Sequence, residues 1–151
     1  MVRIKYLVII IFTILFISTL ACRAQTREDS IGVFKTLQLY VGFVARMNAD
    51  SIGALFGEDG VLMKSSNVSI IGSKAVSEYL ISFSGFHVIS HRMNGDTLIF
   101  VNGYAVQTGE YWQQVGIPSG DTVNVAGRFR IEWQRSKNES WKIHHISTKP
   151  K

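Results

Sequence analysis

The sequence predicts an α+β domain in which three N-terminal helices pack on an antiparallel sheet. Up to Gly85, apolar residues recur mostly at spacings of three or four, whereas long runs of alternating apolar and polar residues follow it. The first pattern has the period of a helix and the second has the period of a strand. Because no repeat or internal linker separates the two halves, we expect helices and sheet to share one core.

The first helix is expected to begin at Ser30, with Asp29 or Ser30 as its N-cap. Its apolar face is formed by Ile31, Phe34, Leu37, Val41, Val44 and Met47. Asp50 is expected to cap a second, shorter helix, which ends at Gly57 because glycine favours a helix C-terminus. The apolar residues of this second helix are Ile52, Leu55 and Phe56.

Two short strands and a third helix follow. Asp59-Gly60 is a turn sequence that leads into a strand over residues 61–63, and a second strand covers residues 68–71. The third helix is expected to open at Gly72-Ser73 and to end at Gly85. One side of it carries Val76, Leu80 and Phe83.

Four long strands are expected after Gly85, over residues 87–101, 104–115, 122–135 and 141–148. The first of them is expected to bend at Asn94-Gly95. Asn102-Gly103 is a hairpin signal, and the segment from Pro118 to Asp121 is a looser turn. These connections predict a meandering antiparallel sheet.

The N-terminus has the layout of a secretory signal, with Arg3 and Lys5 before an apolar run from Tyr6 to Ala21. Cleavage after Ala24 gives a signal of residues 1–24. The alternative is a lipoprotein signal of residues 1–21, with Cys22 lipidated as the new first residue. With either cut the protein is expected to be exported. It would then be periplasmic, secreted, or anchored to a membrane only through this segment or its lipid. Residues 25–29 would be a short tether, and 30–149 one domain.

Composition excludes several classes of function. Removing Arg3, Lys5 and Arg23 with the signal lowers the formal net charge from +5 to +2, so we expect no nucleic-acid partner. Cys22 is the only cysteine, which leaves the domain without a disulfide or a thiolate site. Because the sequence contains no nucleophile elbow, phosphate loop, zinc helix or dinucleotide fingerprint, we expect no cofactor and no metal.

The alternation of apolar and polar residues along the last two strands indicates which side chains share a face of the sheet. Phe129, Ile131 and Trp133 form an apolar set, while Arg128, Arg130 and Glu132 form the opposite, polar set. On the last strand Trp141, Ile143, His145 and Ser147 share one parity, which we expect to face the helices. The sequence therefore predicts that His145 points inward and that the charged set faces solvent or a second copy of the chain.

His145 is the best single candidate for a functional group, because a neutral imidazole in a semi-apolar pocket can donate or accept a proton. A core histidine that bonds a neighbouring hydroxyl or carbonyl is the alternative. Tyr40 on the first helix is a candidate hydroxyl donor, and it too has a packing alternative. The walls of a ligand pocket would be formed by Tyr40, Phe129, Trp133 and Trp141.

Several segments carry a resemblance to a known family. They are Asn48-Ala-Asp50 with Leu55-Phe56 and Asp59, then Gly72, then Ala105 with Thr108-Gly109, then the ending Trp141-Lys-Ile-x-His145. In this pattern the chain resembles the NTF2-like superfamily in its SnoaL-like/DUF4440 branch. The resemblance implies a cone in which helices and a curved antiparallel sheet enclose a pocket. It does not fix an activity, since the superfamily includes isomerases, dehydratases, epoxide hydrolases, ligand carriers and assembly modules.

The enzymes of that superfamily are matched poorly. The position of the acidic general base of the ketosteroid-isomerase-like members corresponds to Lys64, and their first-helix tyrosine falls near Gly42, two residues from Tyr40.

Three functions therefore remain open. The favoured one is a non-enzymatic pocket for a small apolar or amphipathic molecule with His145 as the polar anchor. The others are an isomerase, dehydratase or hydrolase that uses His145, and an interaction module with a filled interior. A homodimer through Arg128, Arg130 and Glu132 is expected in each case.

Overall fold

The computed structural model of the chain describes residues 27–65, 68–101, 103–138 and 140–151. The chain divides after Ile31, and residues 32–151 form one compact unit. The predicted signal, both of its cleavage sites and Cys22 lie outside the described residues. Among the helices that are described, none has the length and apolar character needed to cross a bilayer.

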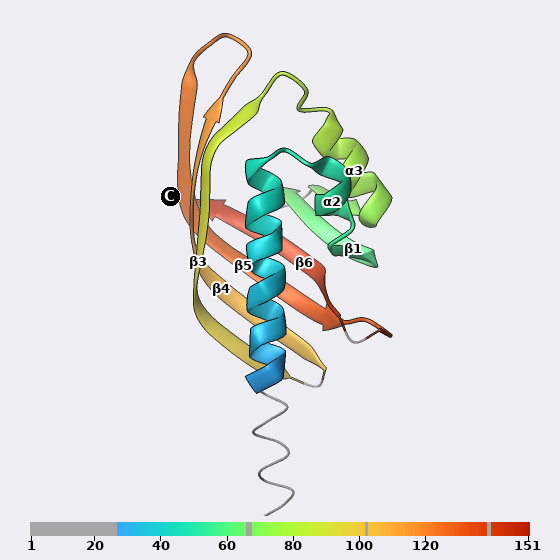
Figure 1. Cartoon of the computed structure of the whole chain (residues 1–151). Coiled ribbons are helices and arrows are strands. Elements are labelled where there is room, and N and C mark those ends of the chain that lie inside the picture. The colour runs from blue at the N-terminus through green and yellow to red at the C-terminus, as the bar shows by residue number, and fades with distance from the viewer. Residues whose placement is uncertain (1–26, 66–67, 102, 139) are drawn as a thin grey trace, which may run out of the picture. The chain divides into compact units, whose positions relative to one another are not determined.

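The described residues confirm the α+β fold, with helices on one face of a six-stranded sheet in the order β2-β1-β6-β5-β4-β3 (Figure 1). The first helix covers residues 27–45, so the described part of the expected tether is helical. The other elements, in chain order, are α2 (Ala49–Gly53), β1 (Phe56–Ser65), β2 (Val68–Ile71), α3 (Ser73–Ile81), β3 (His87–Val101), β4 (Tyr104–Gly116), β5 (Thr122–Arg135) and β6 (Trp141–Pro150).

The sheet is mixed and not wholly antiparallel, because β1 pairs with β6 in parallel while the other neighbouring strands are antiparallel. This pairing also shortens the second helix. Asn48, and not Asp50, caps α2 by accepting a 3.0 Å hydrogen bond from the backbone N–H of Ser51. The helix ends at Gly53, since the carbonyl of Leu55 accepts a 2.8 Å bond from the backbone N–H of Ile143 on β6. Strand pairing thus takes Leu55 and Phe56 out of the predicted helix.

Well-packed side chains fill one end of the space between helices and sheet. Val33 and Leu37 of the first helix belong to the same buried cluster as Ile131 and Trp133 of β5. The indole Nε1 of Trp133 donates a 3.1 Å hydrogen bond to Oε1 of the fully buried Gln107. This end of the unit is therefore a core and leaves no room for a ligand.

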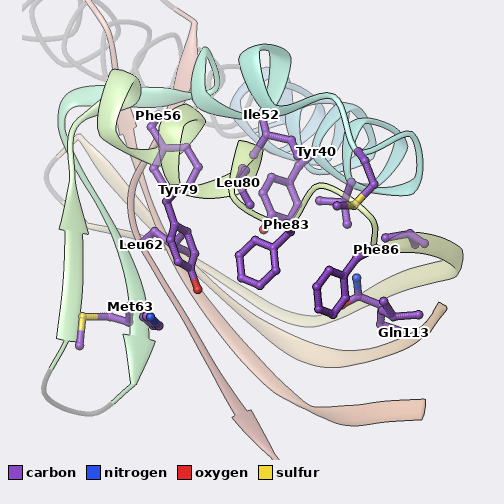
Figure 2. A pocket seen from close by; sticks show the side chains of 15 residues that line it. Tyr40, Ile52, Phe56, Leu62, Met63, Tyr79, Leu80, Phe83, Phe86 and Gln113 are labelled. Carbon is purple, nitrogen blue, oxygen red and sulfur yellow. The ribbon is translucent and has the colours of Figure 1, made fainter. Parts of the chain in front are cut away.

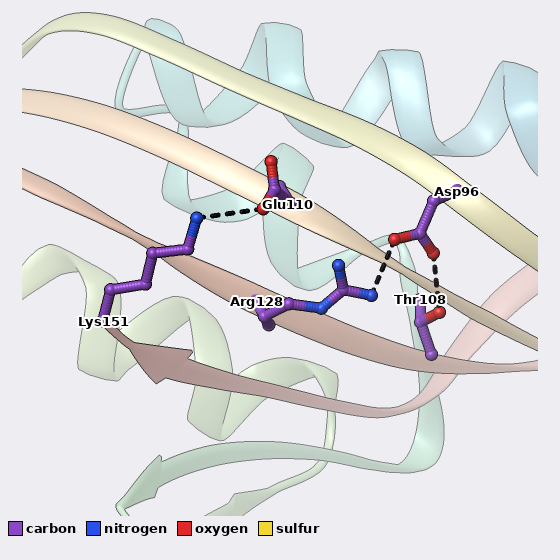
Figure 3. Close-up of polar contacts among 5 residues, drawn as sticks. All are labelled: Asp96, Thr108, Glu110, Arg128 and Lys151. Atoms are coloured by element: carbon purple, nitrogen blue, oxygen red, sulfur yellow. Dashed lines mark hydrogen bonds and ion pairs between the residues drawn. The ribbon is translucent and has the colours of Figure 1, made fainter.

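The opposite face of the sheet carries an ordered set of charges (Figure 3). Arg128 forms a 2.6 Å ion pair with Asp96, which also accepts a 2.9 Å hydrogen bond from the hydroxyl of Thr108. Lys151 lies 3.0 Å from Glu110. The Thr108 hydroxyl and the Arg128 guanidinium lower the pKa of Asp96. Arg130 and Glu132 are paired on the same face, as the alternation along β5 predicts.

Candidate functional site

A cavity with two adjoining lobes lies between the helices and the concave face of the sheet. The lobe beside the helices, called here the helix lobe, has a volume of about 370 Å³. The second, called here the sheet lobe, has a volume of about 520 Å³. The lobes adjoin because they share seven lining residues, which are Tyr40, Val44, Leu62, Met63, Tyr79, Phe83 and Gln113. The interior is therefore open and not filled.

The cavity continues from the core along the first helix and the strands. On the first helix, Val33 and Leu37 pack in the core, whereas Tyr40, Val44 and Met47 further along line the cavity. The strands contribute in the same way. The strand residues that line it include Val88 and His91 of β3, Gln113 and Val115 of β4, and Val125 of β5. Met93 of β3 and Tyr111 of β4 belong to the buried core and also line the sheet lobe, so core and cavity adjoin within one continuous interior.

Aromatic rings form much of the helix-side wall. Tyr79 and Phe83 meet edge to face with ring centroids 5.1 Å apart, and Phe83 meets Phe86 in the same way at 5.6 Å. Figure 2 shows these rings together with Tyr40 around the helix lobe. The helical spacing of Tyr79 and Phe83 on α3 and the turn after it places both on one side. The wall is therefore mostly apolar.

Three of the polar side chains that line the cavity, those of Tyr40, His91 and Gln113, come from three different elements. The rings of Tyr40 and His91 lie edge to face with centroids 6.5 Å apart. Gln113 lies directly opposite His91 in the pairing of β4 with β3, so the two share the concave face. Neither ring nitrogen of His91 has a hydrogen-bond partner among the described residues, although both are buried. His91 therefore offers an unused donor and an unused acceptor.

Burial keeps the Tyr40 and His91 side chains uncharged near neutral pH. Desolvation lowers the pKa of His91 to about 4, because the imidazolium form loses its hydration. Desolvation also raises the pKa of Tyr40 to about 12. Tyr40 keeps some solvent-accessible surface overall, yet protein surrounds its hydroxyl closely enough to produce this shift. The pair can therefore exchange hydrogen bonds with a ligand but does not present a charge to it.

Charged groups are scarce in this interior. Of the described residues that line the two lobes, Lys64 alone is charged, and none is acidic. No group of three or more histidine, cysteine, aspartate or glutamate side chains able to hold a metal ion occurs in the described part of the chain. The arrangement suits an uncharged or mainly apolar body.

Tyr40 and His145, paired in the sequence-based hypothesis, are not brought together. Tyr40 lines both lobes. The prediction that His145 points inward is wrong, because it lies opposite Glu132 on β5 and shares the outer face with it. A register shift causes this: Trp133 lies opposite Ile143 and Glu132 opposite His145, so β6 carries one extra residue at this point. The alternation reverses there, and Ile146 takes the inward position.

The three aromatic residues predicted as pocket walls lie at the filled end of the interior. Phe129 and Trp133 are 2% and 0% exposed and belong to the core. Trp141 is also buried, with its ring 5.9 Å from that of Phe100, and the close approach of the first helix over it requires the missing side chain of Gly32. None of these three lines either lobe.

His91 and Gln113 were not predicted from the sequence as site residues. A register shift between Val88 and Ser90 breaks the alternation at the start of β3, so counting from His87 gives the wrong face. Counting backward from the buried Met93 gives the right one, since His91 is two residues away. The sequence signal was that His91 has the same strand parity as the apolar Met93. The pairing of β3 with β4 then places Gln113 opposite His91.

A groove of about 750 Å³ borders both lobes and is called here the rim groove. It is lined by Met63, Lys64, Thr108, Arg128, Phe129, Arg130, Ser147, Thr148, Lys149 and Pro150. The pairing of β1 with β6 reaches Leu62 and Ile146, and the groove takes in the residues that follow on both strands. It shares Lys64 with the helix lobe and Ser147 and Thr148 with the sheet lobe. The rim groove therefore adjoins both lobes at the ends of β1 and β6 and continues onto the outer face of the sheet, where Thr108, Arg128 and Arg130 line it.

Solved structures share this fold at low sequence identity. A ketosteroid isomerase-like protein from Erwinia carotovora atroseptica is 16% identical with a TM-score of 0.69, over 77% of this chain and 91% of that one. An NTF2-like protein with a cystatin-like fold from Novosphingobium aromaticivorans is 16% identical with a TM-score of 0.70, over 85% and 86%. A protein from Catenulispora acidiphila, solved in complex with S-DNPA, is 12% identical with a TM-score of 0.65, over 82% and 94%. At these identities the likeness concerns the fold alone.

Sequence comparison identifies the family more directly. No curated protein matches the chain. The profile of the SnoaL-like domain, however, matches residues 25–147, which is most of the sequence and includes every residue of the cavity before Thr148. The helices, the curved six-stranded sheet and the cavity between them agree with that match. The chain therefore belongs to the SnoaL-like domain family, within the NTF2-like superfamily.

Proposed function

We propose that this protein binds a small apolar or amphipathic molecule in the two-lobed cavity. The observation that carries the proposal is the open interior itself, with lobes of about 370 and 520 Å³. Ligand sites in proteins are concave, mostly apolar and of this size, with a few polar groups that orient the ligand. A neighbour in fold, the Catenulispora acidiphila protein, was solved in complex with S-DNPA, which supports the same use of the fold.

Tyr40, His91 and Gln113 replace His145 as the polar anchors in this proposal. A ligand hydroxyl or carbonyl between them would satisfy the buried nitrogens of His91, which otherwise remain without partners. Leaving a buried polar group unpaired costs about 1–3 kcal/mol, so a ligand that pairs it gains selectivity over one that does not. These three groups fit an uncharged oxygen carried on the apolar body of the ligand.

A proton-transfer enzyme is the second candidate, and the Tyr40–His91 pair is the observation that favours it. A general acid or base works best when its pKa lies near the working pH. Burial moves the pKa of His91 to about 4 and that of Tyr40 to about 12, so both lie well away from neutrality. Binding therefore ranks above catalysis. An interaction module with a filled interior ranks third, because the cavity is open.

The experiment fills the cavity by enlarging one side chain that lines it. Val44 lines both lobes, whereas the next residue on the same helix, Ala45, is exposed. We expect Val44→Trp to weaken binding of the neutral fluorescent probe N-phenyl-1-naphthylamine by about tenfold or more, a change of about 1.4 kcal/mol. Ala45→Trp adds the same side chain outside the cavity and should leave binding unchanged. Absence of probe binding to the unmodified protein, or equal binding by both variants, would contradict the proposal.

The N-terminal sequence supports a location outside the cytoplasm, and we propose export as part of this function. Mass spectrometry of the mature N-terminus distinguishes the two cuts. A lipidated Cys22 identifies the lipoprotein, and a free Gln25 identifies cleavage after Ala24. A chain that keeps residues 1–24 after expression in a bacterium would exclude both.

A further inference from the structure

The rim groove carries charge of one sign. Its charged lining residues are Lys64, Arg128, Arg130 and Lys149, and no acidic side chain of the described residues lines it. The two arginines are already neutralised, Arg128 by Asp96 at 2.6 Å and Arg130 by Glu132. The net positive charge of the groove therefore comes from its two lysines.

Lys64 is the cation that reaches the interior. It lines the helix lobe as well as the rim groove, and Leu62, two residues earlier on β1, lines both lobes. Its ammonium lies 5.3 Å from the centroid of the Tyr79 ring, which is part of the cavity wall. Within the described residues Lys64 has no carboxylate partner. The ring attracts the ammonium by a cation–π contact, and an ammonium without a counter-ion can pair with a carboxylate.

From this arrangement we infer that the ligand is an amphipathic acid, with an apolar body in the cavity and a carboxylate at Lys64. The inference rests on the proposed function and adds the charge and orientation of the ligand. A carboxylate deep in the cavity would lose its hydration among apolar walls, whereas one at the boundary with the rim groove keeps water on one side. The same geometry disfavours a ligand with a cationic head group.

The test compares three molecules with one apolar chain and different heads: decanoate, decan-1-ol and decylammonium. Each is titrated against the protein carrying N-phenyl-1-naphthylamine, at low salt and near neutral pH. A partly exposed ion pair is worth up to about 1 kcal/mol, so decanoate should displace the probe about fivefold more tightly than decan-1-ol. Decylammonium should be the weakest. Added salt should reduce the preference for decanoate, because it screens an exposed pair.

Two variants assign the preference to one residue. Lys64→Gln keeps a long polar side chain and removes the charge, and we expect it to make decanoate and decan-1-ol bind equally. Lys74→Gln removes a lysine that is exposed on α3 and paired with Glu78, and it should leave the fivefold preference intact. Equal binding of decanoate and decan-1-ol to the unmodified protein would overturn the inference while leaving the proposed function standing. A preference that survives in Lys64→Gln would also overturn it. Failure of all three molecules and of the probe to bind would instead count against the proposed function.

Discussion

His91 shows how one buried side chain defines the site. It faces the cavity from β3, meets the ring of Tyr40 and has two buried nitrogens without partners among the described residues. Burial lowers its pKa to about 4 from an ordinary value of 6.5. The group is therefore neutral in the folded protein over a range in which the unfolded chain binds a proton.

This difference predicts a pH-dependent stability. Between about pH 6.5 and pH 4 the unfolded chain binds a proton at His91 that the folded chain does not, so the free energy of unfolding falls as the pH falls through this window. The loss at about pH 4.5 is on the order of 2 kcal/mol relative to pH 7. Urea denaturation of the unmodified protein and of His91→Gln, which cannot titrate, measures it.

The comparison with His91→Gln cancels the contributions of other groups. The stability difference between the two proteins should change by about 2 kcal/mol between the two pH values. A difference that is the same at both would mean that His91 is solvated in the folded state. It would then remain protonated near pH 5 and would suit the proton-transfer candidate better.

The sequence placed Tyr40 at the cavity correctly and His145 incorrectly, because a helical repeat tolerates no hidden shift here while a strand alternation contains one. The position of Tyr40 follows from the regular helical repeat of Leu37, Val41 and Val44, which no insertion disturbs. The face of a strand residue depends on an unbroken alternation, and one extra residue at His144-His145 reverses it. Sequence alone does not reveal this bulge, because two adjacent histidines are compatible with either face.

At the scale of elements, the close packing of β4 against its neighbours depends on a glycine. A Cβ atom at Gly109 would lie 2.1 Å from the backbone oxygen of Asn94 and 2.6 Å from Cε1 of Phe129. At Gly42, in the first helix, the nearest atom would be 3.5 Å away on the flexible side chain of Arg46. The two glycines should therefore respond in opposite directions to the same substitution.

Gly109→Ala is expected to destabilise the protein by more than about 2 kcal/mol, because the backbone of β3 and the core ring of Phe129 must both move. Gly42→Ala is expected to stabilise it by up to about 1 kcal/mol, since alanine has the higher helix propensity. Chemical denaturation of both variants measures the difference. Equal changes in the free energy of unfolding of the two variants would mean that β3 and β4 are less closely packed than the contacts at Gly109 indicate.

The elements themselves were largely predictable. The long strands β4 and β5 pair without a register shift, and their alternation of Phe129, Ile131 and Trp133 with charged residues assigned both faces correctly. The end of α2 and the parallel pairing of β1 with β6 were not predictable. Both depend on a hydrogen bond between Leu55 and Ile143, which are far apart in the sequence.

At the scale of the whole molecule, the outer face of the sheet is expected to form a homodimer. It carries both signs of charge in alternation, with Arg128 and Asp96 paired beside Arg130 and Glu132, and such a surface can complement itself across a two-fold axis. Light scattering on the order of tens of micromolar should give twice the monomer mass. Arg128→Glu, which sets a like charge against Asp96, should lower that mass, whereas Lys74→Glu on α3 should not. A monomer at this concentration would refute the dimer.

The central claim is that the cavity beside His91 binds the ligand, and the histidine side chains report on it directly. The chain has four histidines: His87, His91, His144 and His145. Their imidazole signals can be followed by NMR, and assigned with single His→Gln variants, while N-phenyl-1-naphthylamine is added. The account predicts that the His91 signal shifts in proportion to the occupied fraction and that the His144 and His145 signals do not. A shift of the His145 signal without one of His91, or saturation by the probe with no histidine signal affected, would contradict it.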